Sequence, residues 1–332
     1  MANSTLTAVE GVKVGHAQNE LARTGCTVIL FEPEADVACD ARGGWPGTYD
    51  THSIDIGKTY VKKHAIFLTG GDVFGFDSAI GVRRFLLEQK MAMPSGAGKI
   101  PGIVGANIWD LDFASIHEAD YSQLGCLAGV NASSNPAAEG NVGAGMGATV
   151  GKLKGLSFAC KGGCGTYAVR LPNDIVVGAL IITNSVGNVY DIDADAKTIV
   201  GTRTPGGGFL EFDDLIPDYM HEEIPRSKTT IGVVATNVDL SHENVIRLAQ
   251  MANDGLAMSI RPIHMSRDGD TLFAASTARI GGMRESKRMV DLLGYTATRC
   301  VVRAVVRSVK AAQSLSNIPS WDELTRRPAN NS

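Results

Sequence analysis

The sequence has no long apolar run and no large excess of charge of either sign. Its most apolar stretch, residues 176–183, is far shorter than the ~20 residues that cross a bilayer. The net charge of −4 provides neither a basic footprint for nucleic acid nor a polybasic patch for a membrane surface. No basic region followed by an apolar core opens the chain, so we expect no signal peptide and a cytoplasmic protein.

The six cysteines form no pattern typical of a disulfide scaffold or a zinc site. Cys160 and Cys164 are separated by three residues, but no second pair with zinc-ligand spacing follows. We therefore expect reduced thiols that are buried or half-buried.

Glycine is abundant, with 38 residues, and it is clustered. The clusters lie at residues 43–44, 70–71, 140–151, 162–165 and 206–208. Because glycine serves where a backbone turns with positive φ or approaches another group closely, these clusters predict a compact fold with tight turns around a site.

Short β-branched apolar runs alternate with amphipathic stretches, which predicts an α/β or α+β fold. The predicted strands are Thr27–Phe31, Ala65–Thr69, Ile175–Thr183, Thr230–Thr236 and Thr271–Ala275. The predicted helices are Phe74–Met91, a helix that begins after Ser241 as N-cap, and a helix through Val302–Ala312. The segment Thr202–Arg226 is rich in Gly, Pro and acidic residues, so it is either an ordinary surface loop or the flexible segment that a processing site requires.

Thr229 opens one of the predicted strands, directly after Lys228. A threonine at the start of a strand is by itself an ordinary structural residue. Its hydroxyl becomes a useful nucleophile only with a base nearby. If the peptide bond before it is cleaved, its own α-amine appears, with a pKa near roughly 7.7–8.0, and can accept the hydroxyl proton.

The order of several short motifs carries a resemblance that no single motif would. The motifs are Val9–His16, Arg23–Val28, Asp40–Gly44, Leu68–Gly71, Glu139–Gly145, Gly151–Lys152, Thr229–Asn237 and Asp268–Thr271. Over nearly its whole length the chain resembles the self-processing L-aminopeptidase/D-amidase-esterase and β-aminopeptidase family, which also contains a nylon-oligomer hydrolase.

The resemblance implies an α/β fold, a four-layer αββα sandwich like that of N-terminal-nucleophile hydrolases, with ornithine acetyltransferase-like topology. It implies one catalytic domain, residues 1–332, cleaved into an α chain of residues 1–228 and a β chain of residues 229–332. It also implies a tetramer of αβ heterodimers, a small peptide or amide substrate, and chemistry that needs no cofactor and no metal.

The resemblance also assigns catalytic roles. Thr229 matches the nucleophile, Lys152 matches a residue close to it, and Asn184 matches the residue at the oxyanion position. Asp268 and Asp270 match residues that contact the amine and hydroxyl of the nucleophile. Each role is chemically sound, since an amide N–H is a neutral oxyanion donor and a carboxylate orients an ammonium group.

Without the resemblance, ordinary structural roles fit the same residues. Lys152 would be a solvated lysine in a glycine-rich loop, and Asn184 a turn residue at a strand end. Asp268 and Asp270 would form a tight turn; the later acidic ligands of a calcium loop are missing.

Two features near the glycine-rich segment need separate interpretation. The run Gly143–Gly147 invites a dinucleotide-binding interpretation, but no apolar strand precedes it, so we interpret it as backbone close to the active site. Glu139, just before it, is a candidate for binding the amine of the substrate.

The chain departs from the family pattern at two positions. The residue before the nucleophile is usually Asn or Gly, whereas here it is Lys228, for which a left-handed backbone costs ~1–2 kcal/mol. This could slow self-cleavage. Trp109 stands where Tyr or Phe is common, and its size could reshape the substrate pocket.

The leading hypothesis is therefore a self-processing amidohydrolase or aminopeptidase that releases N-terminal residues from small peptides, β-peptides, amino amides or esters. The alternatives are an endo-type amide-oligomer hydrolase, an acyltransferase of the ornithine acetyltransferase type, and an unprocessed binding protein without enzymatic activity. Cleavage at Thr229 would divide the 35.0 kDa chain into pieces of about 24 and about 11 kDa.

Overall fold

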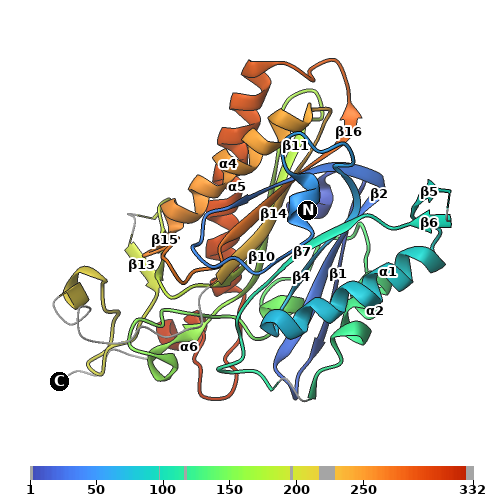
Figure 1. Ribbon diagram of the computed structural model, residues 1–332. Helices are drawn as coiled ribbons and strands as arrows, with labels where there is room; N and C mark the ends of the chain where they lie inside the picture. The colour runs from blue at the N-terminus through green and yellow to red at the C-terminus, as the bar shows by residue number, and fades with distance from the viewer. Residues whose placement is uncertain (1–2, 97, 116–117, 195–196, 217–228, 327–332) are drawn as a thin grey trace.

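The computed structural model describes residues 3–96, 98–115, 118–194, 197–216 and 229–326. A nine-stranded mixed sheet dominates it (Figure 1). Its strands are β1 (Val12–Asn19), β2 (Thr24–Ala41), β3 (Thr48–Tyr49), β4 (Lys62–Thr69), β7 (Ile103–Asn107), β10 (Gly163–Arg170), β11 (Val176–Asn184), β14 (Thr229–Val238) and β16 (Thr271–Ile280). Their order is β10-β11-β14-β16-β2-β4-β7-β3, and β1 pairs with β2.

The long strand β2 connects two layers of this sheet. Its first part, residues 24–31, pairs with β1 and β4, and its last part, residues 36–41, pairs with β16. The register of the β2–β4 pair shifts between Leu30 and Ala35, in the segment where exposed Glu32 and Pro33 interrupt the apolar pattern. One strand thus contributes to both β layers, so the described strands form one continuous sheet that folds into two stacked layers, called here the two walls.

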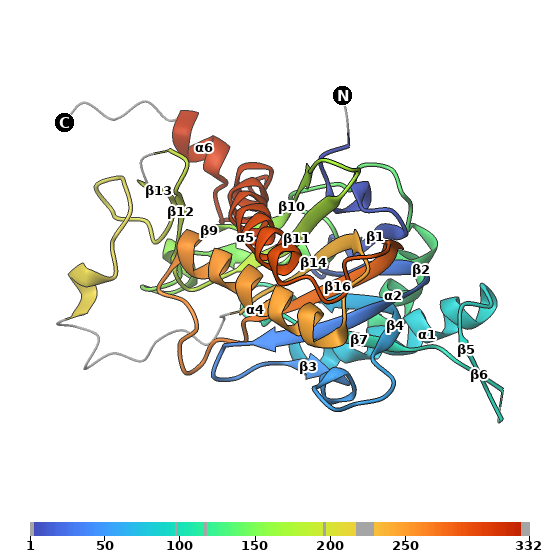
Figure 2. The same cartoon turned by 90° about the horizontal axis from the view of Figure 1, so that it is seen from above.

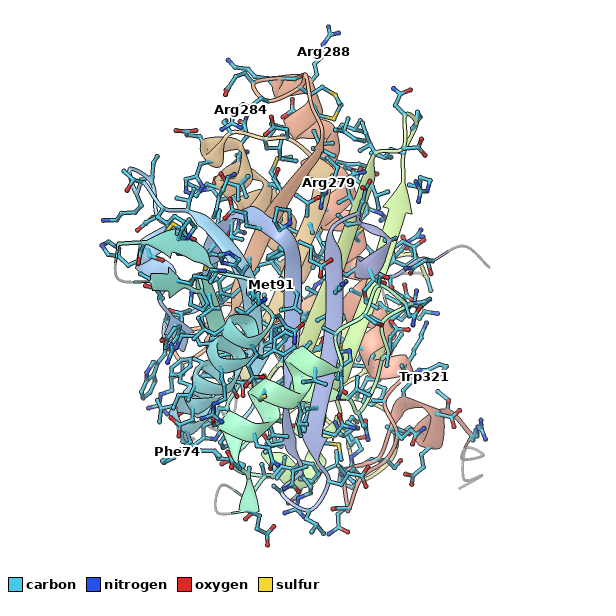
Figure 3. All side chains as sticks on the ribbon, turned by 90° about the vertical axis from the view of Figure 1, so that its right-hand side faces the viewer. Phe74, Met91, Arg279, Arg284, Arg288 and Trp321 are labelled. Carbon is cyan, nitrogen blue, oxygen red and sulfur yellow. The ribbon has the colours of Figure 1, made fainter. Side chains whose placement is uncertain are left out.

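Five α-helices accompany the strands in the described part of the chain: α1 (Ser78–Glu88), α2 (Tyr121–Val130), α4 (His242–Ser259), α5 (Lys287–Lys310) and α6 (Trp321–Arg326). Figure 2 shows α4 and α5 on one side of the strands and α1 and α2 on the other. Figure 3 shows α1 and α2 in front of the sheet, with Phe74 and Met91 beyond the two ends of α1.

Three separate hydrophobic cores show that the layers are stacked in the order αββα. Because side chains alternate along a strand, Ile181 of β11 packs in the core under α4 and α5, whereas Leu180 and Ile182 pack between the two walls. Ile66 and Leu68 of β4 meet them there. Ala65 and Phe67, on the opposite face of β4, pack in the third core with α1 and α2. The four-layer sandwich is confirmed.

The shorter strands form three small sheets outside these walls. They are β5 (Met93–Ser95) with β6 (Gly98–Ile100), β8 (Thr149–Val150) with β9 (Cys160–Lys161), and β12 (Asn188–Asp191) with β13 (Lys197–Val200) and β15 (Ile260–Arg261). The β8–β9 pair follows the glycine-rich segment and contacts the end of β11, where the N–H of Thr149 donates to the side chain of Asn184.

All five predicted strands and all three predicted helical regions are present, with different limits. The region 74–91 begins as a 3₁₀ turn, Asp72–Asp77, before α1. Ser241 is the N-cap position of α4, but its hydroxyl donates to Glu285 rather than capping the helix. The C-terminal helix α5 begins at Lys287, well before the predicted stretch. No described helix combines the length and apolarity needed to cross a membrane.

Candidate active site

Thr229 begins β14 and is buried, with 6% of its surface exposed. On one side β14 pairs antiparallel with β11, and the register places Thr229 opposite Asn184. On the other side β14 runs parallel to β16, with Ile231 opposite Thr271. If this register is extended by two residues toward the start of both strands, Thr229 lies beside Gly269. Strand pairing alone therefore gathers these three residues at one edge of the sheet.

Gly269 lies directly against the side chain of Thr229. A Cβ atom added at Gly269 would lie 2.9 Å from the hydroxyl oxygen of Thr229 and 3.1 Å from the carbonyl oxygen of Trp45. Any side chain here would thus displace the hydroxyl, since real Cβ atoms do not approach other atoms so closely. The glycine between Asp268 and Asp270 therefore leaves the space that the Thr229 side chain occupies.

The glycine-rich loop 42–47 encloses this edge of the site. The backbone N–H groups of Arg42 and Gly43 donate to the carbonyl of Asp270, and the N–H of Trp45 donates to the carbonyl of Asp268 at 2.8 Å. A Cβ atom at Gly43 would lie 2.3 Å from the Asp268 carbonyl, so only glycine permits this approach. The loop places the main chain of Trp45 against Gly269, and the residue as a whole is 72% exposed.

Asn184 is fully buried and its side chain is held on both sides. Its Oδ1 accepts hydrogen bonds from the N–H of Thr149 and from Nζ of Lys152, both at 2.9 Å. Its Nδ2 donates to the carbonyl of Trp109 at 2.8 Å. Lys152, with only 1% exposed, also donates to the main-chain carbonyl of Asn184 at 3.0 Å. An amide nitrogen carries two N–H groups, so one remains for a developing oxyanion.

The two aspartates of the loop before β16 make different contacts. Asp270 accepts from the N–H of Thr230 at 2.6 Å through Oδ1, and from the N–H and Nδ1 of His264 at 3.0 Å through Oδ2. Asp268 accepts from the N–H of Met265 at 2.7 Å. Asp270 thus ties the first residues of β14 to the start of β16.

A second lysine, which the sequence did not single out, organises the glycine-rich segment. Lys161 is fully buried, and its Nζ donates to the carbonyls of Gly145, Ala148 and Gly162 at 2.8–2.9 Å. Thr149, whose N–H reaches Asn184, pairs with Lys161 between β8 and β9. The interpretation of residues 143–147 as backbone near the site is consistent with these contacts.

Buried Asp110 lies close to the same segment. It accepts from the N–H of Gly71 and the hydroxyl of Thr24, both at 2.8 Å, and a Cβ at Gly147 would lie 2.3 Å from its Oδ2. Burial raises the pKa of Asp110 to about 6, opposed by its hydrogen bonds and by the charge of Lys161. Burial lowers the pKa of Lys161 to about 7, opposed by Asp110. Each of the two groups therefore stabilises the charged form of the other.

Comparisons with known proteins identify the family. The model of peptidase family S58 matches residues 4–319 of the chain. The chain belongs to peptidase family S58. Members of a peptidase family hydrolyse peptide or amide bonds, which is the class of reaction that the buried hydroxyl, the lysine and the amide suit.

Individual relatives agree with this assignment to the S58 family. The chain is 33% identical to an uncharacterized aminopeptidase of Mycobacterium leprae, over 96% of this chain and 93% of the relative. It is 30% identical to a 6-aminohexanoate-oligomer endohydrolase of a Kocuria species, over 90% and 84% of the two chains. The solved L-aminopeptidase D-Ala-esterase/amidase of Ochrobactrum anthropi, described as a variant of the Ntn hydrolase fold, superposes with a TM-score of 0.69. Its sequence identity is 21%, and 96% and 88% of the two chains are covered.

The structure of this S58 family member brings most of the predicted site residues together. Lys152, Asn184, Thr229, Asp268 and Asp270 converge at one edge of the sheet. The carbonyl of Trp109 contacts Asn184. Lys228 lies outside the described residues.

Glu139 is not part of this cluster. Its carboxylate accepts from the N–H of Thr166 at 2.8 Å and pairs with Arg307 of α5 at 2.6 Å. Thr166 pairs with Leu180, four residues along β11 from Asn184, which corresponds to ~13 Å at the rise of a strand. The carboxylate therefore joins α5 to β10, away from Thr229.

The described residues contain no group of three or more His, Cys, Asp or Glu side chains placed to hold a metal ion. The cluster instead offers a hydroxyl, an amide N–H donor, a buried ammonium group and two carboxylates. Together these groups fit nucleophilic attack on a carbonyl carbon.

Proposed function

We propose that this S58 peptidase is a self-processing amidohydrolase in which Thr229 is first the site of cleavage and then the nucleophile. The observation that carries the proposal is the placement of the buried Thr229 hydroxyl between Gly269 and the strand partner Asn184, whose amide is fixed by Lys152. A strand start that serves only a structural purpose does not need a buried amide, held by a buried lysine, directly opposite it on the neighbouring strand.

In the processing step, the Thr229 hydroxyl oxygen attacks the carbonyl carbon of Lys228. The bond between that carbon and the Thr229 nitrogen breaks, the nitrogen takes up the hydroxyl proton and becomes an amine, and an ester remains. Water then hydrolyses the ester, leaving a carboxylate on Lys228 and a free α-amine and hydroxyl on Thr229. The same residue then holds nucleophile and base.

In the hydrolytic step, the α-amine of Thr229 accepts the hydroxyl proton as the oxygen attacks the substrate carbonyl. The second N–H of Asn184 stabilises the oxyanion, a contribution of about 3 kcal/mol for a preorganised donor. The protonated amine gives its proton to the leaving amine, and an acyl-enzyme remains. Water attacks the acyl-enzyme and regenerates Thr229. Asp270, held by the Thr230 N–H, lies close enough to orient the ammonium form.

The substrates we propose are small: the N-terminal residues of short peptides, β-peptides, amino amides and esters. The Mycobacterium leprae relative is named an aminopeptidase, which favours release of a terminal residue. The Kocuria relative is named an endohydrolase of 6-aminohexanoate oligomers, so cleavage within an amide oligomer is the second candidate.

Processing is tested by denaturing gel and intact mass of four proteins: wild type, Thr229→Ala, Thr229→Ser and Thr230→Val. We expect two pieces for wild type and Thr229→Ser, and one piece for Thr229→Ala. Thr230→Val is the matched control, since the neighbouring threonine is equally buried and its hydroxyl has no hydrogen-bond partner among the described residues. An active wild type with an unbroken chain contradicts the proposal.

Substrate class is tested on the mature protein with amino acid p-nitroanilides, β-amino acid p-nitroanilides and 6-aminohexanoate oligomers. Preference for the p-nitroanilides supports the aminopeptidase, and preference for the oligomers supports the endohydrolase. Adding hydroxylamine or an amino ester as acceptor separates hydrolysis from acyl transfer, because only a transferase gives mainly the amide or hydroxamate product in water.

A further inference from the structure

A groove of about 390 Å³ lies away from Thr229, at the start of β4 and β7 and beside α1. Its lining residues come from the segment before β4, from Lys63 of β4, from Arg83 of α1 and from the segment leading into β7: Tyr49, Asp50, Ser53, Lys58, Thr59, Tyr60, Lys63, Arg83 and residues 100–103. The groove and the active site lie at opposite ends of β7, whose last residue, Asn107, packs against Gly47 of the loop beside Thr229. Ile103 lies four positions before Asn107, or ~13 Å along β7, and Tyr49, which also lines the groove, pairs with Gly105, two positions before Asn107.

Positive charge dominates this groove although the chain as a whole carries a net charge of −4. Lys58, Lys63 and Arg83 line it, and Asp50 is the one carboxylate among the lining residues. Asp50 already accepts a hydrogen bond from the Ser53 hydroxyl at 2.9 Å. Uncompensated positive charge in a concave site favours a negatively charged ligand.

Lys63 is the central cation, and the structure leaves most of its donors unused. It is 2% exposed. It lies on the same face of β4 as Ala65 and Phe67, which pack against the α1–α2 layer, because every second residue of a strand shares a face. An ammonium group has three N–H donors. Within the described part of the chain, its Nζ has one hydrogen-bond acceptor, the Tyr60 carbonyl at 3.3 Å, and the nearest carboxylate oxygen, of Asp50, is 4.0 Å away.

Other donors converge on the same space. The hydroxyl of Tyr60 is buried and has no hydrogen-bond partner among the described residues. Arg83 of α1 uses one of its five N–H donors on the hydroxyl of Tyr49, and its guanidinium group lies 5.9 Å from the centre of the Tyr49 ring. Tyr49 is itself fixed by an edge contact with Phe67, at 5.5 Å between ring centres. The groove is thus lined by hydrogen-bond donors of Lys63, Tyr60 and Arg83, and the Tyr49 ring that contacts Arg83 packs against Phe67.

The buried Lys63 ammonium group thus has one long hydrogen bond, a tyrosine ring at 5.0 Å and a carboxylate oxygen at 4.0 Å, and an anion in the groove would satisfy its remaining N–H donors. We propose that this groove binds the oxyanion group of a small molecule, a phosphate or a carboxylate, with Lys63, Arg83 and the Tyr60 hydroxyl as its donors. The volume is within the range of small-molecule sites, roughly 300–1,000 Å³. The ligand accepts hydrogen bonds from all three groups and neutralises Lys63, whose pKa is lowered by burial and raised by Asp50.

The test is isothermal titration of the full-length protein with inorganic phosphate, pyrophosphate and citrate at constant ionic strength, with chloride as the reference anion. We expect saturable binding of at least one of them at one site per chain. Binding of the phosphates alone identifies a phosphate site, and binding of citrate alone a carboxylate site. Lys63→Met and Arg83→Gln should each weaken binding by at least about tenfold, the loss expected for one charge-assisted hydrogen bond.

Lys62→Met is the matched control, since Lys62 is the preceding residue of the same strand but is exposed and pairs with Glu34 at 3.2 Å. It should bind as wild type does. Absence of saturable binding for all three anions overturns the proposal, as does a loss in Lys62→Met as large as in Lys63→Met. Arg83→Gln gives an independent result if Lys63→Met does not fold. Thr229→Ala should bind equally well, so the outcome does not depend on the proposed catalytic function.

Discussion

Replacement of Asn184 by aspartate separates the catalytic contribution of this side chain from its structural one. The two side chains have the same shape, so Oδ1 still accepts from the Thr149 N–H and from Lys152. The N–H donors disappear. In the wild-type structure Nδ2 lies 2.8 Å from the carbonyl of Trp109, and in the variant a second carboxylate oxygen takes its place there. The proposed oxyanion donor is thus replaced by an acceptor while the protein contacts on the other side are kept.

The two effects differ enough in size to be told apart. Losing the neutral hydrogen bond to Trp109 costs ~1 kcal/mol, repulsion between the two oxygens adds to it, and the new charge-assisted bond to Lys152 offsets ~1 kcal/mol. We therefore expect the free energy of unfolding to change by less than about 2 kcal/mol. Removing one oxyanion donor lowers kcat by ~10²–10³-fold. Asn184→Ala, in contrast, removes the three buried side-chain hydrogen bonds to Thr149, Lys152 and Trp109 and should cost about 3 kcal/mol of stability.

The assay combines urea unfolding, intact mass and p-nitroanilide kinetics, with kcat normalised to the cleaved fraction of each preparation. We expect Asn184→Asp to fold near wild-type stability and to hydrolyse substrate at least about a hundredfold more slowly. A cleaved Asn184→Asp protein with wild-type kcat would refute the assignment of Asn184 to the oxyanion. A fully stable Asn184→Ala protein would refute the claim that its hydrogen bonds join the loops.

Three further changes test neighbouring parts of the argument. Gly269→Ala should displace the Thr229 hydroxyl and lower kcat about a hundredfold, whereas Gly281→Ala, where a Cβ meets nothing within 4 Å, should leave kcat unchanged. Trp45→Ala, which removes an exposed ring from the loop that contacts Gly269, should raise KM several-fold for apolar p-nitroanilides without preventing the proposed self-cleavage, as measured by steady-state kinetics and gel. Burial lowers the pKa of Lys161 from 10.5 to about 7, so the folded protein binds fewer protons than the unfolded chain between these values, and stability should rise with pH across that window. Urea unfolding at several pH values should show this rise in wild type and a smaller one in Lys161→Met, which should also lose roughly 3 kcal/mol because three carbonyls lose their donor and Asp110 loses a nearby positive charge.

The strands could be predicted because burial on both faces leaves nearly continuous apolar runs. β11 and β14 are buried along their whole length, and both were recognised from β-branched residues. The second half of β2 was missed because Glu32, Pro33 and Glu34 interrupt the apolar pattern where the strand passes between layers. The first half of α5 did carry a signal, since Val290, Leu293, Ala297 and Cys300 are all buried at helical spacing.

Some residues of the candidate site could be predicted from the sequence and others could not, for a physical reason. Residues proposed to act through their side chains, such as Thr229 and Asn184, have functional groups that can be read from the sequence. Lys161 acts on three backbone carbonyls, and a carbonyl exists at every position, so nothing in the sequence marks its partners. Glu139 shows the converse: its carboxylate looked available in the sequence, but Arg307 and the Thr166 N–H, both distant in the chain, occupy it.

The position of Thr229, the proposed nucleophile, follows from strand register rather than from the conformation of a loop. β14 has an antiparallel partner on one side and a parallel partner on the other, so a shift of one residue would turn Thr229 to the opposite face of the sheet. Buried alternation along all ten residues of β14, with Val233 between the walls and Val234 under the helices, prevents that shift. The same packing that stabilises the sandwich therefore fixes the hydroxyl against Gly269 and opposite Asn184. Mutations that loosen either core near Val233 or Val234 should consequently reduce activity before they unfold the protein.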